Sequence, residues 1–265
     1  MSSNLFARAE SCLQQCEPPQ KISCVNELVS AWQADGLETG EVPLSAIAEP
    51  GRPVRPRLVA PRELPRRKLT TSSGHAALIH AICHIEFNAI NLALDAVYRF
   101  RDMPAAYYTD WLRVAAEEGR HFNLLRDHLR TLGFAYGDFD AHDGLWQMAV
   151  ETAHDPLVRM ALVPRVLEAR GLDVTPGIMK KLAAIGDEKA VAILKIIQQE
   201  EVGHVEIGSR WFHYLCKQRE LEAESTFRDL LTQYMKGRIK GPFDRQARLR
   251  AGFSEAELDY LEGAG

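Results

Sequence analysis

Four long segments between Gly74 and Lys217 carry apolar residues at alternating steps of three and four positions. This spacing is typical of helices that bury one face, and strand-like alternation of apolar and polar residues is nearly absent. The predicted helices are Gly74–Arg101, Pro104–Leu132, Leu145–Arg170 and Asp187–Lys217. The sequence therefore predicts an all-α protein whose central part, residues 74–217, is a four-helix bundle.

Charged and polar residues interrupt each apolar stripe near its middle, where a core helix normally has Leu or Val. The interrupting residues are Glu86, Glu118, His121, Glu168, Glu201 and His204. Burying ionised carboxylates costs several kcal/mol each unless a positive charge compensates them. Two metal ions would supply that charge, so we expect all six side chains to converge on one metal centre.

The spacing of these residues supports the same prediction. Glu118 and His121 form a Glu-x-x-His motif, and so do Glu201 and His204, which places both side chains of each pair on one helix face. Glu86 precedes Glu118 by 32 residues, and Glu168 precedes Glu201 by 33. The two helix pairs therefore present matching ligand sets.

In this pattern the chain resembles the ferritin-like di-iron carboxylate superfamily over about residues 74–217. The surrounding phrases HAICHIEFNAINLALDAVYRF, DGLWQMAVETA, EARGLDVTP and KGPFDRQAR are also similar to a bacterial ferritin-like family of unknown function. The superfamily resemblance implies that Glu118 and Glu201 are bridging or terminal carboxylates, that His121 and His204 are terminal ligands, and that Glu86 and Glu168 complete the set.

Mixed carboxylate and imidazole ligation suits iron, and manganese or a mixed manganese–iron pair is an alternative. Two functions then compete. The first is an O2-activating di-iron oxidase or hydroxylase of unknown substrate, and the second is a non-enzymatic iron-binding or ferroxidase and storage protein. About 70 residues before the bundle and nearly 50 after it favour the enzyme, because a storage subunit is little more than its bundle.

Three features near these ligands bear on the site. Pro164 lies one turn before Glu168 and is expected to kink the third helix. His80 and His84 lie on the opposite face from Glu86, so we expect them to hydrogen-bond the N-terminal segment or the linker rather than bind metal. His128 is expected to be a core histidine.

Outside the bundle, the chain is expected to form three further regions. Residues 1–50 should hold two short helices, the first capped by Ser3, with a break at Pro18-Pro19. Residues 51–73 form an Arg- and Pro-rich linker that should stay extended over the outer surface of the bundle. Residues 218–265 form a helical extension, in which Ser254 and Glu257 are expected to make a capping box.

Composition limits the remaining possibilities. The net charge of −4 argues against a protein that binds nucleic acid over its whole surface, and no segment resembles a signal peptide or a good membrane span. The five Cys include no Cys-x-x-Cys pair, so all five are expected to be reduced thiols and the protein to be cytoplasmic.

The expected partners are O2 and a small-molecule or anionic substrate that the sequence does not identify. The basic residues of the linker and of the tail permit an anionic substrate, and the phosphate-bearing candidates include RNA, by analogy with a tRNA hydroxylase of similar architecture. The tail residues in question are Lys236, Arg238, Lys240, Arg245, Arg248 and Arg250.

Overall fold

The computed structural model describes residues 3–235 and 239–263, and this part of the chain is all-α, as predicted. It holds no strand, only two isolated bridges that join Asn4 to Glu38 and Leu58 to Ala141. The chain divides into two compact units, Met1–Val150 and Glu151–Gly265.

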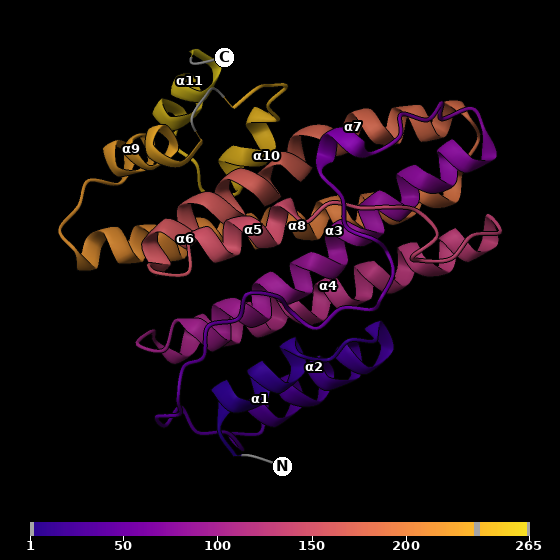
Figure 1. Ribbon diagram of the computed structural model, residues 1–265. Coiled ribbons are helices and arrows are strands. Elements are labelled where there is room, and N and C mark those ends of the chain that lie inside the picture. Colours follow the sequence, from indigo (N-terminus) through magenta and orange to yellow (C-terminus); the bar gives the residue numbers. More distant parts are fainter. Residues whose placement is uncertain (1–2, 236–238, 264–265) are drawn as a thin grey trace. The chain divides into compact units, whose positions relative to one another are not determined.

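The first unit begins with two short helices, α1 (Leu5–Leu13) and α2 (Pro18–Gln33) (Figure 1). The side chain of Asn4 accepts hydrogen bonds from the amides of Phe6 and Ala7, so Asn4 caps α1 and not Ser3 as expected. Pro18 occupies the first position of α2, where its missing N–H costs nothing. The proline pair therefore both separates the helices and starts the second one.

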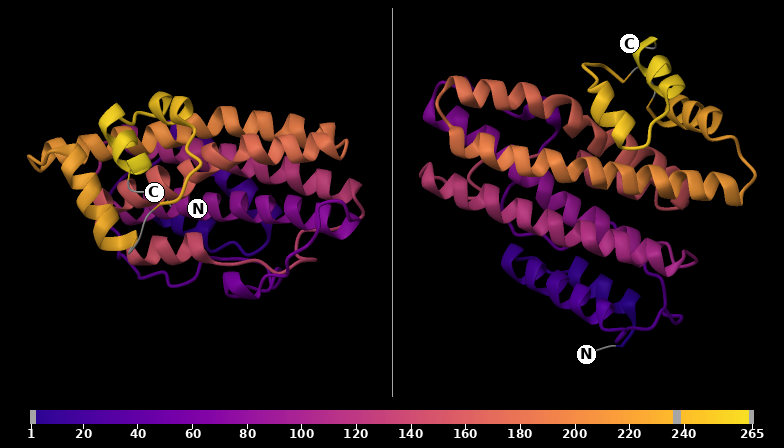
Figure 2. Two further views of the ribbon diagram at one scale, coloured as in Figure 1. Left: turned by 90° about the horizontal axis from the view of Figure 1, so that it is seen from above. Right: turned by 180° about the vertical axis from the view of Figure 1, so that it is seen from behind.

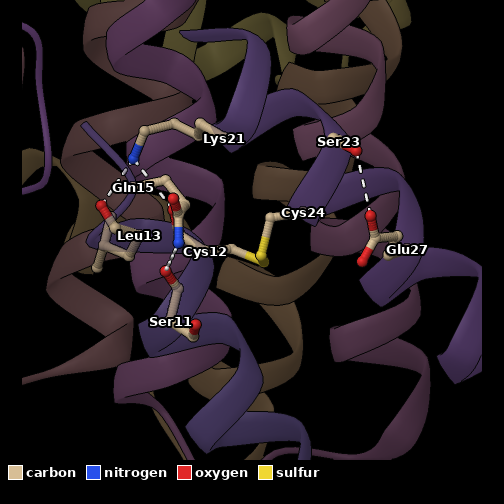
Figure 3. Close-up of a disulfide and its surroundings, with 8 residues drawn as sticks. All are labelled: Ser11, Cys12, Leu13, Gln15, Lys21, Ser23, Cys24 and Glu27. Atoms are coloured by element: carbon tan, nitrogen blue, oxygen red, sulfur yellow. Dashed lines mark hydrogen bonds between the residues drawn. A yellow bond between two sulfur atoms is a disulfide. The ribbon is translucent and has the colours of Figure 1, made fainter. Parts of the chain in front are cut away.

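A disulfide between Cys12 and Cys24 joins α1 to α2 (Figure 3). The prediction that all five cysteines are free thiols is therefore wrong for this pair; Cys16, Cys83 and Cys216 are free. The two helices lie against each other and bring the Cα atoms of Cys12 and Cys24 to 5.3 Å, within the range that a disulfide requires. Sequence spacing alone carries no such information.

Two long helices, α3 (Ser72–Arg99) and α4 (Ala105–Thr131), form the centre of the first unit, with α1 packed on α3 and α2 on α4. Both lie within two residues of their predicted ends, and the side chain of Thr71 caps α3 by accepting from Gly74 N. Helix α3 is long and apolar enough to cross a membrane, but 78% of its most apolar window is buried inside the protein, as in a core helix.

The linker is extended, as predicted, except for one 3-10 turn, η1 (Pro61–Glu63). It packs on the loop that follows α4. The amide of Val59 donates to Ala141 O, and the amide of Ala141 donates to Arg57 O. The Arg57 guanidinium also pairs with Asp140 at 2.6 Å, so part of the basic charge of the linker is compensated within the chain.

The predicted third helix, Leu145–Arg170, is wrong in its extent. A separate helix, α5 (Gly144–Glu151), ends before Asp155, which caps α6 (Pro156–Leu162) by accepting from Leu157 N. A π-helical turn, η2 (Val163–Glu168), then leads into α7 (Ala169–Ala184). The expected irregularity at Pro164 is confirmed, and its form is a π-turn.

Helix α8 (Glu188–Gln218) starts within one residue of its predicted position, with Asp187 as its cap. Only residues 185–187 separate it from α7, so the two helices run antiparallel and lie side by side in both views of Figure 2. Gly208 allows α8 to contact η2, because a Cβ atom at Gly208 would lie 2.3 Å from Cβ and Cγ of Pro164.

Three short helices close the second unit: α9 (Ala223–Met235), α10 (Arg245–Arg250) and α11 (Glu255–Gly263). The predicted capping box is confirmed, because Ser254 N donates to Glu257 Oε2 and Glu257 N donates to Ser254 Oγ. Arg245 and Arg248 form ion pairs with acids of this unit. Two of the tail residues named above, Lys236 and Arg238, lie outside the described residues.

Candidate metal centre

Three of the six predicted ligands meet between α3 and α4. Glu86 comes from the middle of α3, and Glu118 and His121 come from the middle of α4. Each offers a ligand atom within 4.8 Å of the other two, and all three side chains are buried. Nδ1 of His121 lies 3.2 Å from Glu86 Oε2 and 3.3 Å from Glu118 Oε2. The inward stripes of the two helices thus bring these residues together as predicted.

The protonation of this cluster shows how strongly it attracts positive charge. Burial, and after it the neighbouring carboxylate of Glu118, raises the pKa of Glu86 to about 8. Burial alone would lower the pKa of His121, but hydrogen bonds to the two carboxylates raise it to about 11. These shifts favour a neutral carboxyl group at Glu86 and a positively charged imidazole at His121 near pH 7. A divalent metal can replace the protons on these groups, and the donor set of two carboxylates and one imidazole fits such an ion.

The second Glu-x-x-His pair lies on α8 in the other unit. Oε1 of Glu201 is 3.4 Å from Nδ1 of His204, so these two side chains share a helix face as the spacing predicts. His204 is buried, whereas the Glu201 side chain keeps 13% of its surface exposed. This pair matches Glu118 and His121 in chemistry and in helical geometry.

Glu168 is the last residue of η2 and is partly buried. Pro164 of η2 packs directly on Gly208 of α8, and the two helices are antiparallel. Glu168 follows Pro164 by about one turn, and His204 precedes Gly208 by about one turn. Glu168 therefore lies at the level of His204. The second unit therefore holds two carboxylates and one imidazole, the same composition as the cluster of the first unit.

The histidines on the other face of α3 form structural hydrogen bonds, as expected, but not to the expected partners. Nδ1 of His84 lies 2.9 Å from the hydroxyl of Tyr136, and Gly137 N donates to His80 Nε2. Burial lowers the pKa of each imidazole to about 4, which keeps both neutral. Their partners are in the loop after α4 and not in the N-terminal segment or the linker.

One pair of histidines was not anticipated. His75, in the first turn of α3, and His128, near the end of α4, bring ligand atoms within 4.8 Å of each other. His75 extends the inward stripe of α3, because it lies 4, 7 and 11 residues before Ile79, Ile82 and Glu86. The periodicity could have identified it. Buried His128 also has its Nδ1 3.4 Å from Thr131 Oγ1, in agreement with a core histidine.

The similarity of this chain to known proteins covers almost its whole length. A family model described as "Protein of unknown function (DUF455)" matches residues 14–259. This chain belongs to the DUF455 family.

A relative from Haemophilus influenzae is 47% identical over 272 residues, which cover 98% of this chain and 94% of that protein. It carries the name "Uncharacterized protein". No solved structure matches this DUF455 chain significantly.

Proposed function

We propose that this DUF455 protein is an O2-activating di-iron oxidase or hydroxylase on a ferritin-like helical scaffold. The observation that carries the proposal is the buried cluster of Glu86, Glu118 and His121, in which three ligand atoms lie within 4.8 Å of one another. A donor set of the same composition, Glu168, Glu201 and His204, lies on η2 and α8 of the second unit. The two sets have the composition of a di-iron carboxylate site, four carboxylates and two imidazoles.

The ferritin-like resemblance assigns the roles of these residues. Glu118 and Glu201 would hold the metals as carboxylate ligands, His121 and His204 would hold them as imidazole ligands, and Glu86 and Glu168 would complete the two sets. When bound, the metal pair supplies redox chemistry toward O2 for the oxidation of an organic substrate. His121 would hold a metal only as a neutral imidazole, because a protonated imidazole has no free lone pair to donate. Loading is therefore expected to weaken as the pH falls.

Iron fits this donor set because carboxylates and imidazoles dominate it and no thiolate belongs to it; manganese or a mixed pair is the alternative. The π-turn at Val163–Glu168 also supports an enzyme. Such turns are frequent at functional sites, since they free backbone groups and re-aim side chains such as that of Glu168.

The test is the iron content of histidine variants. His121→Ala and His204→Ala each remove one ligand and should lower the iron bound per chain after anaerobic loading with Fe(II). They should also abolish the absorbance change that follows addition of O2. His128→Ala is the matched control, since His128 lies two turns from His121 on the same face of α4, and it should keep most of the iron.

Two results would contradict the enzyme. If the His121 and His204 variants bind two irons and react with O2 like the parent protein, these histidines are not ligands. If the parent protein instead accumulates far more than two irons per chain as mineral, the storage function replaces the oxidase.

A further inference from the structure

A cavity of about 240 Å³ lies in the first unit between the extended linker, the start of α2 and the second half of α4. Three arginines border it: Arg55 from the linker, and Arg126 and Arg130 from α4. Phe122 and Tyr136 also line it, and prolines of α2 and of the linker form part of the wall. No residue of the proposed metal centre lines this cavity.

Arg55 differs from its neighbours in the linker. Arg52 pairs with Glu49 at 3.0 Å, and Arg57 pairs with Asp140 at 2.6 Å. Arg55, between them, has no acidic partner among the described residues and lines the cavity. Acids of the chain thus compensate the charges of Arg52 and Arg57, whereas the charge of Arg55 remains available to bind an anion.

The backbone at Arg55 is held in place by close contact with Gly137. A Cβ atom at Gly137 would lie 3.0 Å from Arg55 Cβ, and the φ angle of Gly137 is +106°, in a region that favours glycine. The amide of Gly137 in turn donates to His80 Nε2 of α3 at 3.0 Å. Arg55 is therefore presented by an ordered contact rather than by a free loop.

The two arginines of α4 share one carboxylate. Asp127 accepts from Arg126 Nη2 at 2.8 Å and from Arg130 Nη1 at 3.2 Å. Asp127 does not line the cavity, and Glu17 is the one acid among the residues that do, so three arginines and one carboxylate border it. The Arg130 side chain keeps 63% of its surface exposed and is free to turn toward a ligand. The balance of charge at the cavity is positive and favours an anion.

The aromatic residues define the rest of the ligand. The Arg126 guanidinium lies 5.9 Å from the centre of the buried Phe122 ring, and the Tyr136 ring is fixed by the contact of its hydroxyl with His84. A planar, apolar group can pack on such rings while guanidinium groups bind a phosphate or carboxylate in a bidentate way.

We propose that this cavity is a second ligand site of the protein, which binds a small organic anion that carries a phosphate or carboxylate on a planar, apolar group. Arg55 and Arg130 bind the anionic group, and Tyr136 packs against the planar part. This site is independent of the proposed metal centre, and its test does not depend on iron.

The experiment uses the full chain and titration calorimetry at fixed ionic strength, with phenyl phosphate, inorganic phosphate and phenol as probes. Phenyl phosphate should bind most tightly and phenol least. Arg55→Ala and Arg130→Ala should each weaken the binding of phenyl phosphate by about tenfold or more, because each removes a charged donor to the anion. Tyr136→Leu should weaken phenyl phosphate and leave inorganic phosphate little changed.

Arg57→Ala is the matched control, because Arg57 lies two residues from Arg55, carries the same charge and is paired with Asp140 outside the cavity. It should leave the affinity within about twofold of the parent value. Circular dichroism should show equal helix content for all variants. The proposal is overturned if phenyl phosphate shows no saturable binding, or if Arg57→Ala weakens it as much as Arg55→Ala. Tight binding of a short RNA that depends equally on both arginines would also overturn it and assign the linker to nucleic acid.

Discussion

Lys21 is a fully buried lysine whose ammonium group lies 5.7 Å from the centre of the Phe87 ring and donates to backbone carbonyls. Its Nζ donates to Leu13 O at 2.6 Å and to Cys12 O at 3.2 Å, so it caps the end of α1 (Figure 3). Burial lowers the pKa of Lys21 to about 7, against 10.5 for an ordinary lysine. Lys21 therefore satisfies the carbonyl groups at the end of α1, but burial disfavours the charged form of its side chain.

This predicts a pH-dependent stability. Between pH 7 and 10.5 the unfolded chain keeps the proton on Lys21 and the folded protein loses it, so the free energy of unfolding rises with pH in this window. Lys21→Met removes that contribution. The stability of the parent protein relative to Lys21→Met should therefore increase from pH 7 to pH 9, by on the order of 1 kcal/mol per pH unit.

Urea unfolding of both proteins at pH 7, 8 and 9 measures this difference. Lys195→Met is the control, because Lys195 is exposed on α8 and should show no such trend. A difference between parent and Lys21→Met that stays flat or falls with pH would show that Lys21 remains protonated in the folded protein.

At the scale of elements, the contact between η2 and α8 depends on one glycine. Gly208 faces Pro164 so closely that a Cβ atom would lie 2.3 Å from the proline ring. At Gly203, five residues earlier on α8, an added Cβ atom would meet no neighbouring atom within 4 Å. Alanine has a higher helix propensity than glycine at both positions, but only at Gly208 would its methyl group clash with a neighbouring residue.

Gly208→Ala should lower the free energy of unfolding by about 1–3 kcal/mol, because the added methyl group must displace η2. Gly203→Ala should leave it unchanged or raise it by up to about 1 kcal/mol. Thermal unfolding of the metal-free proteins measures both. Under the proposed function, Gly208→Ala should also lower iron binding, since displacement of η2 moves Glu168. Equal stability of the two variants would mean that the Pro164 contact is not tight.

At the scale of the whole molecule, one buried ion pair ties the C-terminal extension to the π-turn. Arg165 of η2 is fully buried, and its guanidinium donates to both carboxylate oxygens of Glu257 at 2.7 and 2.8 Å. It also lies 4.3–4.6 Å from the ring centres of Phe212, Phe227 and Phe253. Glu257, which belongs to the capping box of α11, is thus also the counter-ion of Arg165, 92 residues earlier in the sequence.

Glu257→Gln should destabilise the protein by roughly 3–5 kcal/mol, because it leaves the Arg165 charge buried without a counter-ion. The double variant Arg165→Met/Glu257→Gln should recover part of that loss, since it removes the charge as well. Arg245→Gln is the control; Arg245 pairs with surface acids such as Asp259, and its loss should change stability little. Urea unfolding checks these three and the single variant Arg165→Met. A double variant as unstable as the sum of its two single variants would contradict a coupled pair.

The sequence by itself determined the features that depend on local spacing. The helical period located α3, α4 and α8 to within two residues, and it placed Glu86, Glu118 and His121 on stripes that meet in the structure. The capping box of Ser254 and Glu257 also followed from a local motif. These features are predictable because their hydrogen bonds and helix faces involve residues a few positions apart.

Only the tertiary structure decided the features that depend on contacts between distant residues. The disulfide of Cys12 and Cys24 requires α1 and α2 to pack together, and the partners of His80 and His84 require the loop after α4 to fold back on α3. Pro164 predicted an irregular turn, but its π form accompanies the close packing on Gly208. Periodicity specifies which face of a helix is buried, whereas packing specifies what that face meets.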